Sequence, residues 1–181
     1  ISKPIQFMNN GQCDDPNDLA MHIMKKWKCT EDVIENEEVR TVFHNADFTN
    51  AKFGMTDDDK THEFYFVDFS DANFSGAKFY DVTFIGNDFS GANFRNVEGE
   101  MVSFVSSNLE NVIMENFNFE IVWMQNSPLT NGELKNGIID AAFFIDFNIK
   151  NTDLNGTEIN ELIKGGINNF ECKNHTICKD P

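Results

Sequence analysis

The chain has 181 residues, which is the length of one domain. Its 30 acidic and 14 basic side chains give a net charge of −16 at pH 7, which argues against direct binding to nucleic acid or to an anionic membrane. No stretch is apolar enough to span a membrane and no signal peptide is visible, although a first residue of Ile1 rather than Met is consistent with removal of an N-terminal piece.

The N-terminal forty residues predict a helical cap. Asp15-Pro16 is a helix-start signal, and an apolar stripe with helical spacing follows it. The stripe consists of Leu19, Ala20, Ile23, Met24 and Trp27. We therefore assign residues 1–40 to an N-terminal cap.

A period of five residues dominates the middle of the chain. Of the twenty positions reached from Phe64 to Ile159 in steps of five, nineteen are apolar, and Gly99 is the exception. This period suits neither a helix nor a strand and indicates a repeat architecture. The residue two before each large one is usually small or β-branched, and the residue two after is usually Asn, Asp or Gly, which tolerate tight turns. Each unit therefore has two inward positions, one corner and two outward positions.

The ends of the repeat region are less regular. Phe43, Phe48 and Phe53 share the spacing, but the step from Phe53 to Phe64 is eleven residues, one more than two units. We expect the polar segment 54–63 to leave the repeats as a loop within a region of residues 41–161. After it, Glu161–Lys164 run into Gly165-Gly166, which predicts a short helix with a glycine stop, so we assign residues 162–181 to a C-terminal cap.

Two segments show what the units resemble. Ala72–Gly76 (ANFSG) and Ala92–Asn96 (ANFRN) resemble the A-(D/N)-(L/F)-x-x unit of the pentapeptide-repeat family. The resemblance covers roughly residues 41–161 and implies an all-β solenoid, a right-handed quadrilateral β-helix with four units, or twenty residues, per coil. About six coils would stack to about 29 Å at the usual strand spacing of about 4.8 Å. Within this stack, we expect Gly99 to leave a hole in its column.

All four cysteines lie in the predicted caps. Because the caps are at opposite ends of the stack and a disulfide needs Cα atoms within about 7 Å, Cys13 can pair only with Cys29, and Cys172 only with Cys178. The first bridge requires residues 13–16 to fold back along the helix. Two bridges favour an extracytoplasmic compartment: the periplasm, the thylakoid lumen or the exterior of the cell. Four free thiols, hence a cytoplasmic protein, are one alternative. Zinc bound by Cys172, His175 and Cys178 is another, although this set lacks a fourth ligand.

Motifs for catalysis are absent from the sequence. None of the four histidines lies in a metalloprotease motif, and there is no phosphate-binding loop or nucleophile elbow. We therefore expect a protein that is not an enzyme and needs no cofactor or metal. Segments beginning at Asn73, Asn155 and Asn174 match the N-glycosylation pattern, which matters only in a eukaryotic secretory pathway and which Asn-rich corners also create by chance.

Residues twenty apart share one face of the expected β-helix, and two faces stand out. The candidate protein interface is an apolar stripe of Tyr65, Ile85, Val105, Trp123, Phe143 and Ile145. The candidate acidic face consists of Glu98, Glu100, Glu120, Asp140 and Glu158. Exposed aromatic stripes usually mark interfaces, so we predict a homodimer or a protein partner on the first face. The alternative is that the N-terminal cap or a loop folds over part of it.

Two functions follow. The leading interpretation is a non-enzymatic, extracytoplasmic binding or scaffold protein that acts through the apolar face. The alternative comes from the resemblance, because some pentapeptide-repeat proteins protect DNA gyrase from quinolones by resembling B-form DNA in shape and charge. This chain shares their acidity, but it differs from them in its predicted N-terminal helix, its paired cysteines and its single insertion.

Overall fold

The computed structural model describes residues 41–54, 61–165 and 172–175. The chain divides into two compact units, Ile1–Val39 and Arg40–Pro181, and every described residue belongs to the second. The predicted helical cap at residues 1–40 lies outside the described residues and stays a prediction.

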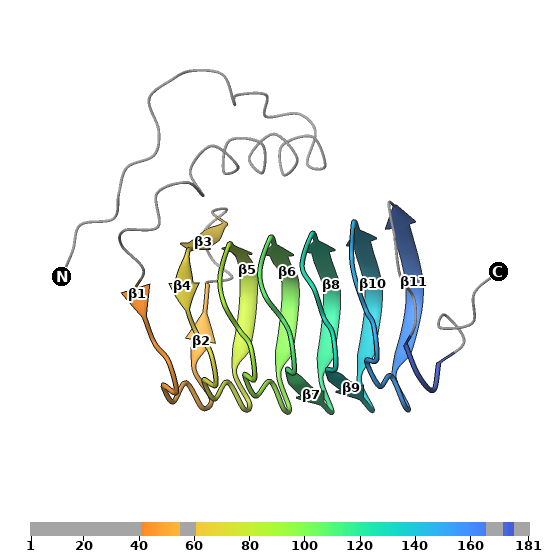
Figure 1. Cartoon of the computed structure of the whole chain (residues 1–181), viewed down its shortest axis with the longest axis horizontal. Helices are drawn as coiled ribbons and strands as arrows, with labels where there is room; N and C mark the ends of the chain where they lie inside the picture. The colour runs from red at the N-terminus through yellow and green to blue at the C-terminus, as the bar shows by residue number, and fades with distance from the viewer. Residues whose placement is uncertain (1–40, 55–60, 166–171, 176–181) are drawn as a thin grey trace, which may run out of the picture. The chain divides into compact units, whose positions relative to one another are not determined.

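Parallel strands build the described part of the second unit (Figure 1). The strands are β1 (Thr41–Val42), β2 (Lys52–Phe53), β3 (His62–Tyr65), β4 (Val67–Asp68), β5 (Lys78–Ile85), β6 (Glu98–Val105), β7 (Ile113–Glu115), β8 (Asn118–Gln125), β9 (Glu133–Lys135), β10 (Ile138–Ile145) and β11 (Glu158–Gly165). The longest sheet has the order β11-β10-β8-β6-β5-β2, with β3 also paired to β5. Two short sheets, β1-β4 and β7-β9, lie on other walls.

The register of this sheet is one coil of twenty residues. Lys78 pairs with Glu98, Glu98 with Asn118, Asn118 with Ile138, and Ile138 with Glu158. The stretch 61–165 therefore makes about five four-sided coils, and residues 41–54 supply part of one more. The predicted all-β solenoid is confirmed.

The corners explain why the period is five. Every fifth residue from Phe66 to Asn116 has a left-handed φ, so the chain turns once per unit. Asn, Asp and Gly occupy most of these positions because they adopt this region most easily. Phe66 and Met101 adopt it as well, with φ values of 53° and 51°.

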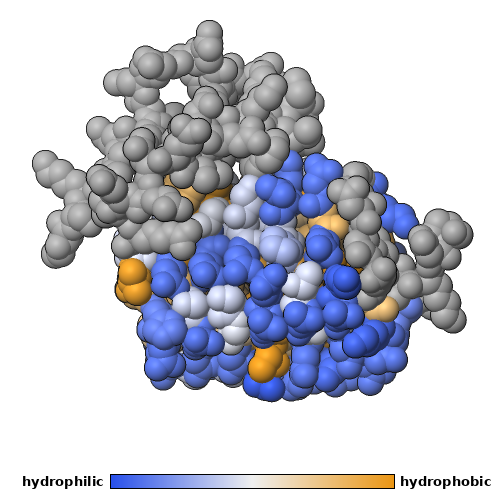
Figure 2. Space-filling view, in the orientation of Figure 1, coloured by the Kyte–Doolittle hydropathy of each residue, from blue (hydrophilic) through white to orange (hydrophobic). Residues whose placement is uncertain are grey.

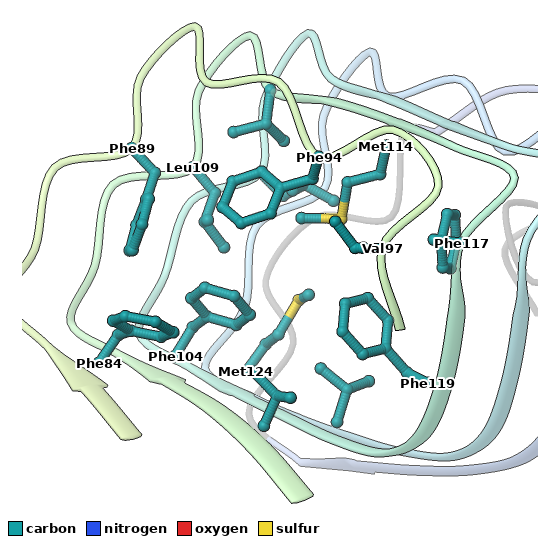
Figure 3. Close-up of a cluster of buried hydrophobic side chains, with 14 of the residues drawn as sticks. Phe84, Phe89, Phe94, Val97, Phe104, Leu109, Met114, Phe117, Phe119 and Met124 are labelled. Carbon is teal, nitrogen blue, oxygen red and sulfur yellow. The ribbon is translucent and has the colours of Figure 1, made fainter. Parts of the chain in front are cut away.

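Large side chains fill the interior in columns. Phe84, Phe104 and Met124 follow one another along one wall, and the side chains of the other walls point toward them (Figure 3). The Phe84 and Phe104 rings stack with centroids 5.4 Å apart, and both are at most 1 % exposed. Such columns bury apolar area at about 25 cal/mol per Å², which is the main stabilising contribution to a fold of this kind.

The prediction of a hole at Gly99 is wrong. A Cβ on Gly99 would lie 2.5 Å from Phe119 Cε1 and 2.7 Å from Val102 Cγ2, so the Phe119 ring already occupies this space. A similar exchange occurs one coil later. Phe117 takes an inward position that is usually small, and a Cβ on Gly137 would lie 2.5 Å from its Cδ1. Each glycine accommodates a large ring of the neighbouring coil.

One inward column is polar, and its members hydrogen-bond from coil to coil. Asn87 Oδ1 accepts from the Val67 N–H at 2.8 Å, Ser107 Oγ accepts from the Asn87 N–H at 3.2 Å, and Ser127 Oγ accepts from the Ser107 N–H at 3.1 Å. All three polar side chains are at most 2 % exposed. Because each is hydrogen-bonded, this column avoids the cost of an unsatisfied buried polar group.

The inserted segment is shorter than expected. Phe53 pairs with Phe79 and His62 with Val82, so six extra residues separate the first pair from the second. Phe53 and Phe64 are therefore consecutive units with an insertion, not three units with one extra residue. The predicted loop 54–63 is too wide because β3 begins at His62. Residues 55–60 lie outside the described residues.

The predicted C-terminal boundary is also wrong. The expected helix at Glu161–Lys164 is part of β11, in which Leu162 pairs with Ala142. The ladder to β10 and the inward position of Leu162 outweigh the local helical preference of this segment. Further on, Lys173 forms a bridge with Asp153, and Cys172 packs against the core, so residues 172–175 continue the twenty-residue register.

Candidate protein-interaction surface

The apolar face is the outer side of the long sheet, and it consists of two rows. The first row contains the outward residues just before each large core residue: Glu63, Thr83, Ser103, Trp123, Phe143 and Ile163. The second row contains those just after it: Tyr65, Ile85, Val105, Gln125, Ile145 and Gly165. The structure thus brings the six predicted stripe residues onto one face, although not into one row.

The second row is not the open stripe that we predicted. Ile85 and Val105 are 3 % and 2 % exposed, whereas Tyr65 at the end of the row is 39 % exposed. The side chains of Ile85 and Val105 are both in outward positions of the coil, and both are nevertheless buried. Exposure of Ile85 and Val105 is therefore a wrong prediction. The period of five places a side chain outside the coil but does not predict how much of that side chain solvent reaches.

The first row carries large apolar side chains in the last three coils. The Trp123 and Phe143 rings stack with centroids 5.1 Å apart and planes 17° apart, and Trp123 Nε1 donates to Gln125 Oε1 at 3.2 Å. Phe143 pairs in register with Ile163, which is 43 % exposed. We call Trp123, Phe143 and Ile163 the apolar row. Sequence reasoning missed Ile163 because it assigned residue 163 to a cap, although a step of twenty from Phe143 leads to it.

The predicted acidic residues are all exposed on an adjoining wall. Lys78 Nζ pairs with Glu98 Oε2 at 2.5 Å, and Asn160 Nδ2 donates to Asp140 Oδ1 at 2.7 Å. The hydrogen bond to Glu98 raises the pKa of Lys78. Glu100 and Glu120 have no cation beside them among the described residues. These carboxylates repel each other across coils, which costs stability unless something external offsets it.

The wall opposite the apolar face alternates charges instead of stacking like ones. Arg95 Nε donates to Glu115 Oε2 at 2.8 Å, and Lys135 Nζ contacts Glu133 at 3.2 Å and Asp153 at 3.5 Å. The hydrogen bond from Arg95 lowers the pKa of Glu115. This wall has little net charge of its own and offers no strong attraction to a charged partner.

A histidine and a serine meet on the remaining wall. His44 Nδ1 lies 2.8 Å from Ser70 Oγ, and Ser70 Oγ donates to Asp68 Oδ1 at 2.6 Å. The same His44 nitrogen is also the one nearest a second carboxylate, Asp71 Oδ2 at 3.9 Å. A catalytic relay needs opposite ring nitrogens for nucleophile and carboxylate, so this cluster does not form one. Among the described residues, no three potential metal ligands converge.

The cysteines remain largely outside what the structure describes. Cys172 is not a free thiol, and Cys13, Cys29 and Cys178 lie outside the described residues. The pairings Cys13–Cys29 and Cys172–Cys178 stay predictions. No described helix is long and apolar enough to cross a membrane.

Seen from the side shown in Figure 2, the described surface is mostly hydrophilic, and its apolar side chains form separate patches. The family model for pentapeptide repeats matches residues 63–98, in 8 copies. No curated protein matches the sequence.

Solved structures with related coils were also found. A pentapeptide repeat protein, Rfr23 from the cyanobacterium Cyanothece 51142, is 16 % identical with a TM-score of 0.44, over 77 % of this chain and 98 % of that one. QnrB1, a plasmid-mediated fluoroquinolone resistance protein, is 13 % identical with a TM-score of 0.35, over 68 % of this chain and 73 % of that one. HetL from Nostoc sp. strain PCC 7120, involved in heterocyst differentiation regulation, is 12 % identical with a TM-score of 0.19, over 75 % and 73 %. Similarities this low carry no conclusion about function.

Proposed function

The chain belongs to the pentapeptide-repeat family of right-handed quadrilateral β-helices, and we propose that it is a non-enzymatic binding protein that contacts another protein through its apolar row. The wall that carries this row is a flat sheet of long parallel strands, which holds the side chains at fixed spacing. A rigid scaffold of this kind loses little conformational freedom when a partner binds.

The apolar row is the observation that carries the proposal. Trp123, Phe143 and Ile163 lie on β8, β10 and β11 in direct register, about 4.8 Å apart from strand to strand. The rings of Trp123 and Phe143 stack and are partly exposed, and Ile163 extends this row with an exposed aliphatic side chain. Aromatic side chains contribute most to interface energy, so Trp123 is the expected anchor.

A second copy of the chain is the simplest partner. A flat sheet face can pair with itself about a two-fold axis, and this pairing would remove both apolar rows from water. A different protein with an apolar face would serve as well, and the structure favours neither.

Sedimentation velocity tests this proposal with two matched variants. Ile163 and Ile138 are both strand isoleucines, 43 % and 42 % exposed, but Ile138 lies on the acidic wall. We expect Ile163→Ser to weaken association and Ile138→Ser to leave it unchanged, with both variants folded. A wild type that stays monomeric at high concentration, together with a loss of stability in Ile163→Ser, would mean that the row is covered within the chain, and the proposal would be wrong.

An extracytoplasmic location is part of the proposal, and it depends on the cysteines. If Cys13 is disulfide-bonded to Cys29 and Cys172 to Cys178, reduction should raise the intact mass of the protein by the mass of four hydrogens. The state of Cys172 supports one bridge. Four thiols that react with an alkylating reagent in the unreduced, denatured protein would remove this argument for an oxidising compartment.

A second candidate function is mimicry of DNA toward a DNA-handling enzyme such as DNA gyrase. The observation that favours it is that Glu100 and Glu120, twenty residues apart on β6 and β8, are both exposed and have no cation beside them among the described residues. A supercoiling assay with purified gyrase distinguishes it from the first proposal. Mimicry predicts an effect on gyrase that depends on the acidic wall, whereas binding through the apolar row predicts none.

A further inference from the structure

One corner of the last coils combines a modification motif with an exposed asparagine. Asn155-Gly156-Thr157 matches the N-glycosylation pattern, and Asn155 is exposed beside the core residue Leu154. Large residues five apart lie on successive walls, so the wall of Leu154 is opposite the wall of Phe144. Asn155 therefore lies on the side of the β-helix that faces away from the apolar row.

The backbone around Asn155 is fully engaged, whereas its side chain is not. The Asn155 N–H donates to Asp153 Oδ1 at 3.1 Å, and its C=O accepts from the Asn136 N–H at 3.0 Å. The Thr157 N–H donates to the Leu154 C=O at 3.1 Å across Gly156, whose φ is 72°, as in a type II turn. Within the described part of the chain, the Asn155 side-chain amide makes no hydrogen bond. A substituent on its Nδ2 would therefore displace no hydrogen bond among the described residues.

The other two matching asparagines are placed differently. Asn73 is half-buried, and its Nδ2 donates to Thr49 Oγ1 at 2.9 Å and to Asp47 Oδ1 at 3.4 Å. Its Oδ1 accepts from the Asn93 Nδ2 at 3.0 Å, so this amide links three coils. Asn174 Nδ2 donates to Asp153 Oδ1 at 2.8 Å. A chain that carried a glycan on Asn73 could not form this ladder when it folds, and a glycan on Asn174 would crowd its contact with Asp153, so we expect the folded, secreted chain to be modified only at Asn155.

We propose that Asn155 is the N-glycosylation acceptor of this chain. The inference rests on the extracytoplasmic location proposed above and names the site at which that pathway modifies the protein. The sugar donor is a lipid diphosphate-linked oligosaccharide. Asn155 Nδ2 forms a bond to the anomeric carbon of the first sugar, the bond from that carbon to the diphosphate oxygen breaks, Nδ2 loses one proton, and the lipid diphosphate leaves.

The structure also fixes when transfer occurs. Thr157 is 5 % exposed, and its hydroxyl donates to the Leu134 C=O at 2.6 Å. The hydroxyl that completes the motif is therefore unavailable to an enzyme once the coil has closed. Transfer precedes folding of this coil, and the glycan then lies on the wall opposite the apolar row, where it leaves the proposed binding surface open.

Secretion of the full chain from eukaryotic cells behind a signal peptide tests this inference. The intact mass is measured before and after a peptide N-glycosidase, which converts a glycosylated asparagine to aspartate. We expect the wild type to carry one glycan, Asn155→Gln to carry none, and Asn73→Gln and Asn174→Gln to keep it. The glycan-bearing peptide of the wild type is identified separately, so the result does not depend on whether Asn73→Gln folds.

Either of two results would overturn the inference: a secreted, folded wild type without a glycan, or a glycan that remains on Asn155→Gln. Sedimentation of the deglycosylated protein separates this outcome from the proposed function. If the wild type is secreted without a glycan but still associates through Ile163, the acceptor site is wrong and the proposed binding surface is retained.

Discussion

Gly99→Ala is the sharpest test of the packing between coils. Gly99 is buried, and its φ is not among the left-handed ones, so alanine is compatible with the backbone. Without a steric clash, replacing glycine by alanine would stabilise the protein by about 0.4–1 kcal/mol, because it lowers the conformational entropy of the unfolded chain. Here the new Cβ would lie 2.5 Å from Phe119 Cε1 and 2.7 Å from Val102 Cγ2, both far inside van der Waals contact. Overpacking of this kind costs about 1–3 kcal/mol, so we expect a net loss of about 1–2 kcal/mol.

Urea unfolding of four variants, Gly99→Ala, Gly132→Ala, Phe119→Leu and the double variant Gly99→Ala/Phe119→Leu, measures this effect. Gly132→Ala is the matched control, because Gly132 is also buried but its Cβ would find its nearest neighbour, the Val112 carbonyl oxygen, at 3.4 Å. We expect that control to change stability little. In Gly99→Ala/Phe119→Leu the smaller side chain vacates the space, so the two losses should fall short of additivity by about 1 kcal/mol. Equal effects at Gly99 and Gly132, or strictly additive losses, would refute the competition between Gly99 and Phe119 for one site.

Three further predictions concern the core, pH and the acidic wall. Phe104→Ala removes a ring from the centre of a column and should cost about 3–5 kcal/mol in urea unfolding, whereas Ser90→Ala on the outside should cost almost nothing; similar losses would mean a wrong repeat phase. Because the pKa of Glu115 is lowered below its ordinary value of 4.5, its contribution to stability is present above that value and is lost as the pH falls through the folded pKa. Glu115→Gln should therefore flatten the acid limb of a stability–pH profile, and an unchanged limb would contradict this. Glu100→Lys with Glu120→Lys should raise the melting temperature at low salt by relieving repulsion, and should abolish any inhibition of gyrase supercoiling; an inhibition that survives would exclude the acidic wall as its cause.

The interior of the β-helix was predictable from the sequence because every inward position is fixed by a local rule. Phe104 and Leu109 occupy the large position of two consecutive units, five residues apart, and both are at most 1 % exposed. Corners followed in the same way, since Asn111 and Asn116 adopt the left-handed region at the expected spacing. No long-range information was needed for either.

The errors arose where packing involves residues that the period does not relate. The hole expected at Gly99 is filled by Phe119 from the next coil. The sizes of the residues twenty apart do not by themselves show in which direction a ring points. The outward position of Ile85 is correct, but the period of five does not predict that this side chain is only 3 % exposed. At Ile163, a plausible local helix signal concealed a position that the twenty-residue register places in β11.

Quenching of Trp123 fluorescence by acrylamide tests the central claim, that the apolar row is the binding surface, most directly. The chain has two tryptophans, Trp27 and Trp123, so a Trp27→Phe variant reports on Trp123 alone. The proposal predicts that quenching decreases as protein concentration rises through the range in which sedimentation shows association, or when a partner protein is added. If a complex forms and the accessibility of Trp123 stays the same, the chain binds through another surface and the claim is wrong.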